Sequence, residues 1–210
     1  MTRVSNRWNE RRYRLIAPAY DASARLLAAA RAHVVGALDV EAADRVLVAG
    51  AGTGLDLPLL PHAARVTAID LTPAMLARAR RRDPGRRFAL ADAARLPFAD
   101  ASFDVVLLHL IVAVIGEPEA CLREAARVTR PGGRVSVFDK FVPDGARPSL
   151  ARRVVNVVAS LSFSDLTRDF GRLLAASGAP LDVVSRRGVA FGDAYEAIVL
   201  TRRVSEPPRA

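Results

Sequence analysis

The stretch VLVAGAGTGLDLPLLP, residues 46–61, places three glycines within five positions, directly after a short apolar run. Glycine reaches backbone conformations that other residues avoid, and it loses more conformational entropy on folding than they do. Three glycines so close together therefore predict a turn whose backbone is approached closely by another group. Such a turn, leaving a buried strand and entering a helix, is typical of nucleotide-binding α/β proteins.

The apolar pattern of residues 41–140 predicts strands and helices in alternation. Alternation at this spacing indicates a parallel sheet covered by helices on both faces, wound in two directions from its first strand. The chain before it predicts two helices, and the chain after it predicts one helix and a closing pair of strands. The predicted strands are 45–49, 65–70, 88–90, 103–108, 134–138, 181–186 and 195–201, and the predicted helices are one before Pro18, 22–38, one beginning in 55–60, one opening at Thr72-Pro73, 117–128 and 145–164.

The length of 210 residues suits one domain, and no repeat or low-complexity linker divides the chain. We expect a doubly wound α/β domain over residues 1–204 with a short disordered tail, 205–210. Within it, residues 1–40 are expected to form an N-terminal helical lid. Residues 41–140 are expected to bind the cofactor, and residues 141–204 to lie on the acceptor side.

The charge favours anionic partners, since 31 Lys and Arg oppose 22 Asp and Glu. The basic residues are spread along the chain without interleaved aromatics, so nucleic acid is the less favoured partner and an anionic membrane surface the more favoured one. A basic surface that is merely solvated is the alternative. The single cysteine excludes an internal disulfide and a cysteine-based zinc cluster, and neither a secretory leader nor a run long enough to span a membrane is evident. We expect a cytoplasmic protein.

The glycine loop reads G-x-G-x-G, whereas the dinucleotide fingerprint requires a glycine where this chain has Leu55. Asp70 ends the second predicted strand, 20 residues after Gly50, where a carboxylate can accept from ribose hydroxyls. Its alternative role is to cap the helix that opens at Pro73. Asp92 follows the third predicted strand and suits an exocyclic amine such as that of adenine. Its alternative role is that of a solvated loop carboxylate.

Four strings carry a resemblance to a known family: VLVAGAGTG, VTAIDLTPAML, DAARLPFADASFDVVLLH and LREAARVTRPGGRV. In order and spacing they resemble the class I S-adenosylmethionine-dependent methyltransferases. The chain is most similar to the branch with quinone-biosynthesis C-methyltransferases and bacterial phosphatidylethanolamine N-methyltransferases. The resemblance implies S-adenosylmethionine as cofactor and a seven-stranded, mostly parallel sheet that ends in an antiparallel hairpin.

The same resemblance implies a set of cofactor-binding residues. The glycine loop would hold the methionine part of the cofactor, Asp70 the ribose, and the residues after Asp70 and Asp92 the adenine. The family usually has an acidic residue two positions before the first glycine, where this chain has Val48, and Asp56 is a candidate to replace it. The implied cofactor-binding residues are Tyr20, Gly50, Ala51, Gly52, Thr53, Gly54, Asp70, Leu71, Met75, Asp92, Ala93 and His109.

Methyl transfer from a sulfonium requires positioning and a desolvated site more than covalent help, and no metal site is predicted. His109 and Asp139 end the fourth and fifth predicted strands, so both are candidate proton acceptors; each has a purely structural alternative. The expected acceptor is a small amphiphile, either a phosphatidylethanolamine-type lipid amine or a quinone ring. The alternatives are another small molecule, nucleic-acid binding, and cofactor binding without turnover. The sequence does not predict the oligomeric state.

Overall fold

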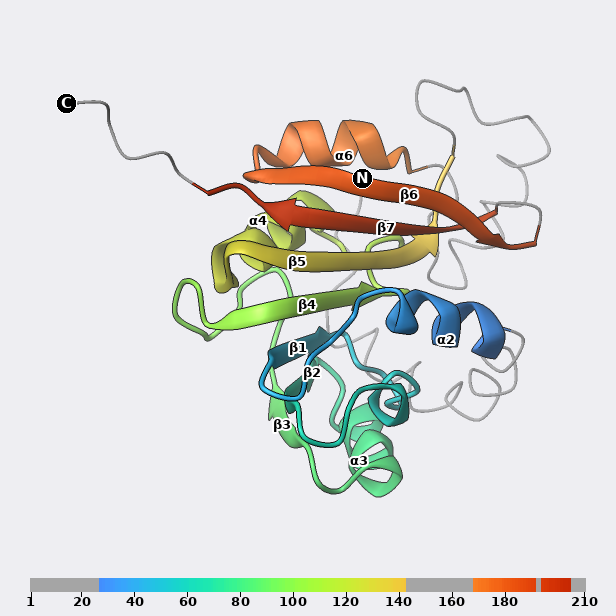
Figure 1. Cartoon of the computed structure of the whole chain (residues 1–210), viewed down its shortest axis with the longest axis vertical. Coiled ribbons are helices and arrows are strands. Elements are labelled where there is room, and N and C mark those ends of the chain that lie inside the picture. Colours follow the sequence, from blue (N-terminus) through green and yellow to red (C-terminus); the bar gives the residue numbers. More distant parts are fainter. Residues whose placement is uncertain (1–26, 143–167, 192–193, 205–210) are drawn as a thin grey trace.

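The computed structural model describes residues 27–142, 168–191 and 194–204, and its centre is one seven-stranded sheet (Figure 1). The strand order is β3-β2-β1-β4-β5-β7-β6, and β7 alone runs antiparallel to its neighbours. This confirms the doubly wound α/β fold and the antiparallel closing hairpin. The strands are β1 Arg45–Ala49, β2 Arg65–Asp70, β3 Arg87–Leu90, β4 Phe103–His109, β5 Thr129–Lys140, β6 Leu181–Ala190 and β7 Tyr195–Arg202.

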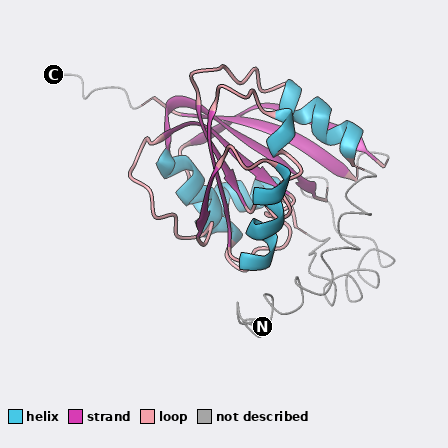
Figure 2. Cartoon of the chain, turned by 90° about the horizontal axis from the view of Figure 1, so that it is seen from below, coloured by secondary structure: helices cyan, strands magenta, loops and turns pink. Residues whose placement is uncertain are grey.

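Helices cover both faces of the sheet (Figure 2). On one face, α4 Pro118–Val128 and α6 Phe170–Ser177 pack over a core that includes Leu122 and Phe170. On the other, α2 Ala28–Gly36 and the 3-10 turn η1 Leu57–Leu59 pack over Val48 and Leu107. The helix α3 Pro73–Arg82 joins this second face through Ala79. The alternating sequence thus folds into the two-sided architecture that the pattern predicts.

Two local predictions need correction. The helix expected from Leu55 is reduced to η1, since Pro58 lacks the backbone N–H that a continuing helix needs. The fifth strand begins at Thr129, so the Arg130-Pro-Gly-Gly segment lies inside β5 at a register shift against β4. A side chain at Gly133 would collide with Thr129 and a backbone oxygen, which explains the glycine.

The helix α6 was not predicted. It begins after Asp169, whose side chain accepts from the Arg172 N–H, and it ends at Gly178 in the left-handed conformation. The predicted helix 145–164, the first predicted helix, the residues 22–26 of the second, and the tail lie outside the described residues. None of the described helices is long and apolar enough to cross a bilayer.

Candidate active site

The glycine loop crosses the carboxyl end of β1, and its three glycines all have positive φ: 70° at Gly50, 55° at Gly52 and 80° at Gly54. Each is required for a different reason. A Cβ on Gly54 would lie 2.9 Å from the Cα of Ala79 in α3, and one on Gly50 would strike the side chain of Ile111. A Cβ on Gly52 would meet no atom within 4 Å. Gly52 is therefore the position at which the bare backbone faces open space.

The carboxylate of Asp70 organises this loop from the end of β2. One oxygen accepts from the Gly52 N–H at 2.9 Å, and the other accepts from the Thr72 N–H at 2.8 Å. Burial raises the pKa of Asp70, and the backbone N–H bonds oppose this rise without cancelling it. The Thr72 bond is compatible with the alternative of a helix-capping role, but the Gly52 bond joins Asp70 directly to the open part of the loop.

Two of the residues expected near adenine differ in exposure. Leu71, directly after Asp70, leaves 42% of its surface exposed, while Met75 is buried in α3. An exposed leucine at the edge of the sheet leaves an apolar surface beside the carboxylate. Leu71 is thus available to contact a planar ligand, whereas Met75 is enclosed by the protein.

Asp92 and Ala93 form a turn after β3. The Asp92 carboxylate accepts from the Ala94 N–H at 2.9 Å, and its carbonyl accepts from the Arg95 N–H at 3.0 Å. The side chain is half-buried, and Ala93 is buried. This geometry fixes the direction of the Asp92 side chain.

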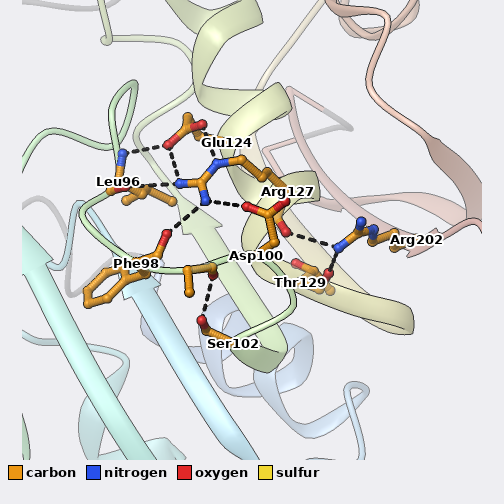
Figure 3. Close-up of polar contacts among 9 residues, drawn as sticks. Leu96, Phe98, Asp100, Ser102, Glu124, Arg127, Thr129 and Arg202 are labelled. Atoms are coloured by element: carbon orange, nitrogen blue, oxygen red, sulfur yellow. Dashed lines mark hydrogen bonds and ion pairs between the residues drawn. The ribbon is translucent and has the colours of Figure 1, made fainter.

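The segment that follows this turn, residues 95–102, is held to α4 by Arg127 and by Glu124, whose carboxylate accepts from the Leu96 N–H at 2.7 Å (Figure 3). The Arg127 guanidinium makes a two-point contact with the Glu124 carboxylate, both bonds at 2.8 Å, and a 2.7 Å bond to Asp100. It also donates to the carbonyls of Phe98 and Leu96, at 2.8 and 3.0 Å. The Glu124 and Asp100 carboxylates raise the pKa of Arg127, so the guanidinium that holds the loop to α4 stays charged.

Buried polar side chains form a second hydrogen-bonded group near the ends of β1 and β4, where α2 packs on the sheet. His109 contacts the Asp56 carboxylate through Nδ1 at 3.1 Å and the Ser136 hydroxyl through Nε2 at 2.9 Å. Arg31, on α2, donates to the same Asp56 oxygen at 2.7 Å. Burial raises the pKa of Asp56, but His109 and Arg31 outweigh it and hold that pKa well below its usual range. Asp56 is therefore an anion held between the Arg31 guanidinium and the His109 ring.

Asp139, predicted as a proton acceptor, is fully buried at the end of β5. Its oxygens accept from the backbone N–H groups of Ala113 and Lys140, at 2.8 and 2.9 Å. Burial raises its pKa despite these bonds. Arg168 donates to the carbonyls of Val112 and Ile115, so the loop after β4 is held at both ends. Asp139 thus fixes the loop whose Ile111 packs on Gly50.

The structure brings most of the predicted site residues to the carboxyl edge of one sheet. The glycine loop with Ala51 and Thr53 follows β1, Asp70 and Leu71 follow β2, Asp92 and Ala93 follow β3, and His109 and Asp139 end β4 and β5. Tyr20 lies outside the described residues. Sequence reasoning missed Arg31, Ser136 and Arg127, because their partners lie 25 to 31 residues away or on another element.

Comparison with known proteins identifies the family. The profile of a methyltransferase domain matches residues 47–137. Phosphatidylethanolamine N-methyltransferase of Cereibacter sphaeroides is 34% identical over 166 residues, which cover 76% of this chain and 80% of that protein. The chain belongs to the class I S-adenosylmethionine-dependent methyltransferases. This confirms the family resemblance, and S-adenosylmethionine is the cofactor of this methyltransferase.

A second curated relative matches over a smaller part of its length, and a solved structure matches in fold. Demethylmenaquinone methyltransferase of Beutenbergia cavernae is 38% identical over 117 residues, 55% of this chain and 49% of that protein, so the match spans about half of the relative. Among solved structures, the putative methyltransferase in complex with the Haloferax volcanii Trm112 activator superposes with a TM-score of 0.74. It is 19% identical, and the match covers 91% of this chain and 98% of that one. This last likeness concerns the fold alone.

The residues at the edge of the sheet fit the cofactor. S-adenosylmethionine presents a ribose with two hydroxyls, a planar adenine and a charged amino-acid end. The Asp70 carboxylate, the exposed Leu71 and the open backbone at Gly52 offer an acceptor, an apolar contact and space for close approach, respectively. The methyltransferase therefore carries groups of suitable chemistry on two adjacent loops, those that follow β1 and β2.

Proposed function

We propose that this methyltransferase transfers a methyl group to the amine of a phosphatidylethanolamine-type lipid. The observation that carries the proposal is the similarity to the Cereibacter sphaeroides phosphatidylethanolamine N-methyltransferase, which extends over most of both chains. A quinone ring is the second candidate acceptor, favoured by the demethylmenaquinone methyltransferases that match the central part of the chain.

The proposed cofactor site is the carboxyl edge from β1 to β4. The Gly50–Gly54 loop receives the methionine part, Asp70 accepts from the ribose hydroxyls, and Leu71 lies against adenine with Asp92 at its edge. The closure of Tyr20 over the cofactor stays a prediction. The proposed cofactor-binding set remains Tyr20, Gly50, Ala51, Gly52, Thr53, Gly54, Asp70, Leu71, Met75, Asp92, Ala93 and His109.

The proposed acceptor side is the end of β5 and the β6–β7 hairpin. The Lys140 ammonium lies 5.5 Å from the centre of the Tyr195 ring, and Tyr195 in turn contacts Phe138 and Phe191. Phe191 leaves 61% of its surface exposed. A cation beside an aromatic and apolar surface suits a molecule with an anionic phosphodiester and an apolar body.

When bound, S-adenosylmethionine supplies the electrophilic methyl group. The chain has to orient the acceptor nitrogen in line with that group, exclude water, and receive a proton from the amine. Asp139 is the proposed proton acceptor, since burial raises its pKa and makes its carboxylate more basic. Both ring nitrogens of His109 are engaged by Asp56 and Ser136, which supports a positioning role for His109 rather than proton transfer.

We also propose that the protein is cytoplasmic and contacts an anionic membrane surface peripherally. The net charge of +9 supports attraction to anionic lipids. Nucleic acid is the less favoured partner, because the basic residues are not accompanied by aromatics able to stack bases.

The test is methyl transfer in vitro with the full chain and S-adenosylmethionine labelled in its methyl group. Vesicles containing phosphatidylethanolamine, vesicles containing a demethylated quinone, and duplex DNA are offered separately. We expect label in phosphatidylethanolamine, and its loss in the Asp70→Asn variant. Label in the quinone alone would select the second candidate, and no label in any acceptor despite cofactor binding would contradict the proposed transfer to a lipid amine.

A further inference from the structure

The ion pair of Arg31 and Asp56 is buried, yet it leaves hydrogen-bonding capacity unused. The side chains are 6% and 5% exposed, and one bond of 2.7 Å joins Arg31 Nη1 to Asp56 Oδ1. His109 contacts the same oxygen, Oδ1. No described residue donates to Oδ2 of Asp56. Arg31 Nε is the one fully buried side-chain nitrogen or oxygen without a partner among residues 27–142, 168–191 and 194–204.

Such an arrangement is unfavourable for an isolated fold. Burying two charges carries a desolvation penalty that their attraction repays only when the remaining donors and acceptors are also satisfied. Buried polar atoms without partners are rare in folded proteins, and each one requires an explanation. Oδ2 of Asp56 accepts no hydrogen bond from any described residue. A ligand that supplies both a donor and an acceptor would complete the pair.

The Arg31–Asp56 pair lies at the same carboxyl edge of the sheet as the glycine loop. Asp56 comes four residues after Gly52, where the backbone faces open space. Its partner His109 ends β4 on that same edge of the sheet. Val48, two positions before the loop, is buried in the apolar core and offers no charge there.

Two other carboxylates at this edge also hold the backbone, which leaves a ligand only the second lone pairs of their oxygens. Both oxygens of Asp70 accept from backbone N–H groups, and so do both oxygens of Asp139. Asp56 combines a fixed negative charge with an oxygen that has no described donor. An adjacent guanidinium with an unsatisfied N–H makes the pair complementary to an α-amino acid, whose ammonium donates and whose carboxylate accepts.

We propose that Asp56 and Arg31 together hold the amino-acid end of the cofactor, with the ammonium on Asp56 and the carboxylate on Arg31. The proposal rests on the proposed cofactor site at the glycine loop. His109 positions the Asp56 carboxylate through Nδ1, and Ser136 in turn holds His109 through Nε2. Asp56 thereby supplies the negative charge that Val48 cannot.

The test compares two ligands that differ in the amino-acid end. S-adenosylhomocysteine carries it and 5′-methylthioadenosine lacks it, while both contain the ribose and adenine. Isothermal titration measures both affinities for the wild type, Asp56→Asn, Arg31→Met and, as a matched control, Asp70→Asn. We expect Asp56→Asn and Arg31→Met to lose about tenfold or more in affinity for S-adenosylhomocysteine and less than about twofold for 5′-methylthioadenosine. We expect Asp70→Asn to lose affinity for both ligands.

Equal losses for the two ligands in Asp56→Asn, or no loss, would overturn the proposal while leaving the cofactor site intact. A wild type that binds neither ligand would instead refute the proposed cofactor site itself. If the variants fail to fold, the proposal is tested on the wild type alone by measuring its affinity for a third ligand, S-adenosylhomocysteine whose α-amino group is replaced by hydrogen. We expect at least tenfold weaker binding of that compound, and equal affinity would contradict the role of Asp56.

Discussion

Replacing Gly52 with alanine separates ligand binding from folding. Gly52 has φ of 55°, a conformation that costs an L-residue about 1–2 kcal/mol. The added Cβ meets no protein atom within 4 Å, so no steric term is added to this backbone cost. A domain with a typical stability of about 5–15 kcal/mol remains folded after such a loss. The methyl group does, however, occupy the space into which we place the cofactor.

We therefore expect Gly52→Ala to lower the free energy of unfolding by about 1–2 kcal/mol. We expect it to weaken S-adenosylhomocysteine binding by at least about tenfold, or about 1.4 kcal/mol. Urea unfolding followed by circular dichroism gives the first quantity, and isothermal titration gives the second. Gly178→Ala is the matched control, because Gly178 also has a positive φ of 62°, also meets nothing within 4 Å, and lies at the end of α6.

The control should show the same loss of stability and an unchanged ligand affinity. Equal affinities for the wild type and Gly52→Ala would refute the placement of the cofactor against this residue. Loss of binding in Gly178→Ala as well would show that the affinity follows global stability instead.

Three further substitutions test neighbouring parts of the site. Gly54→Ala should unfold the protein at a lower urea concentration than Gly52→Ala, because its Cβ would lie 2.9 Å from the Ala79 backbone; equal midpoints would contradict this. Because burial raises the pKa of Asp70 above 3.8, cofactor affinity should fall as the pH is lowered through that raised pKa. Isothermal titration should therefore find that the affinity of Asp70→Asn depends less on pH than that of the wild type. The contribution of Asp70 to the free energy of unfolding has the opposite trend: it is full below pH 3.8 and is lost as the pH rises through the raised pKa. Arg127→Lys should cost about 1–3 kcal/mol and accelerate amide hydrogen exchange in residues 95–102, since lysine cannot reproduce the two-point contact with Glu124; unchanged exchange would argue against the clamp.

The sequence predicted the strands best where a buried apolar run is bounded by polar or turn residues. The bounds of β1 and β2 agree with the prediction, because each is a run of five or six residues closed by Gly50 or Asp70. The helix α6 was missed although Asp169 and Gly178 mark its two ends. Its eight residues are too few for a long apolar stripe and lie between the predicted helix 145–164 and the strand that begins at Leu181, so only the two capping residues mark it.

The cofactor loop and Asp70 could be predicted because their chemistry depends on local backbone geometry and on a fixed spacing along the chain. The partners of Asp56 could not, since Arg31 lies 25 residues before it and His109 lies 53 residues after it. Only the packing of α2 and β4 brings these side chains together. The same limit explains why His109 was predicted as a proton acceptor, while its contacts favour positioning.

The measurement that tests the central claim most directly is a crystal structure of the protein grown with S-adenosylhomocysteine. We predict that the ribose hydroxyls donate to the Asp70 carboxylate and that the amino-acid end lies over Gly52, beside Asp56 and Arg31. A carboxyl edge without the ligand, or a ligand bound with its ribose away from Asp70, would contradict the assignment of this loop as the cofactor site.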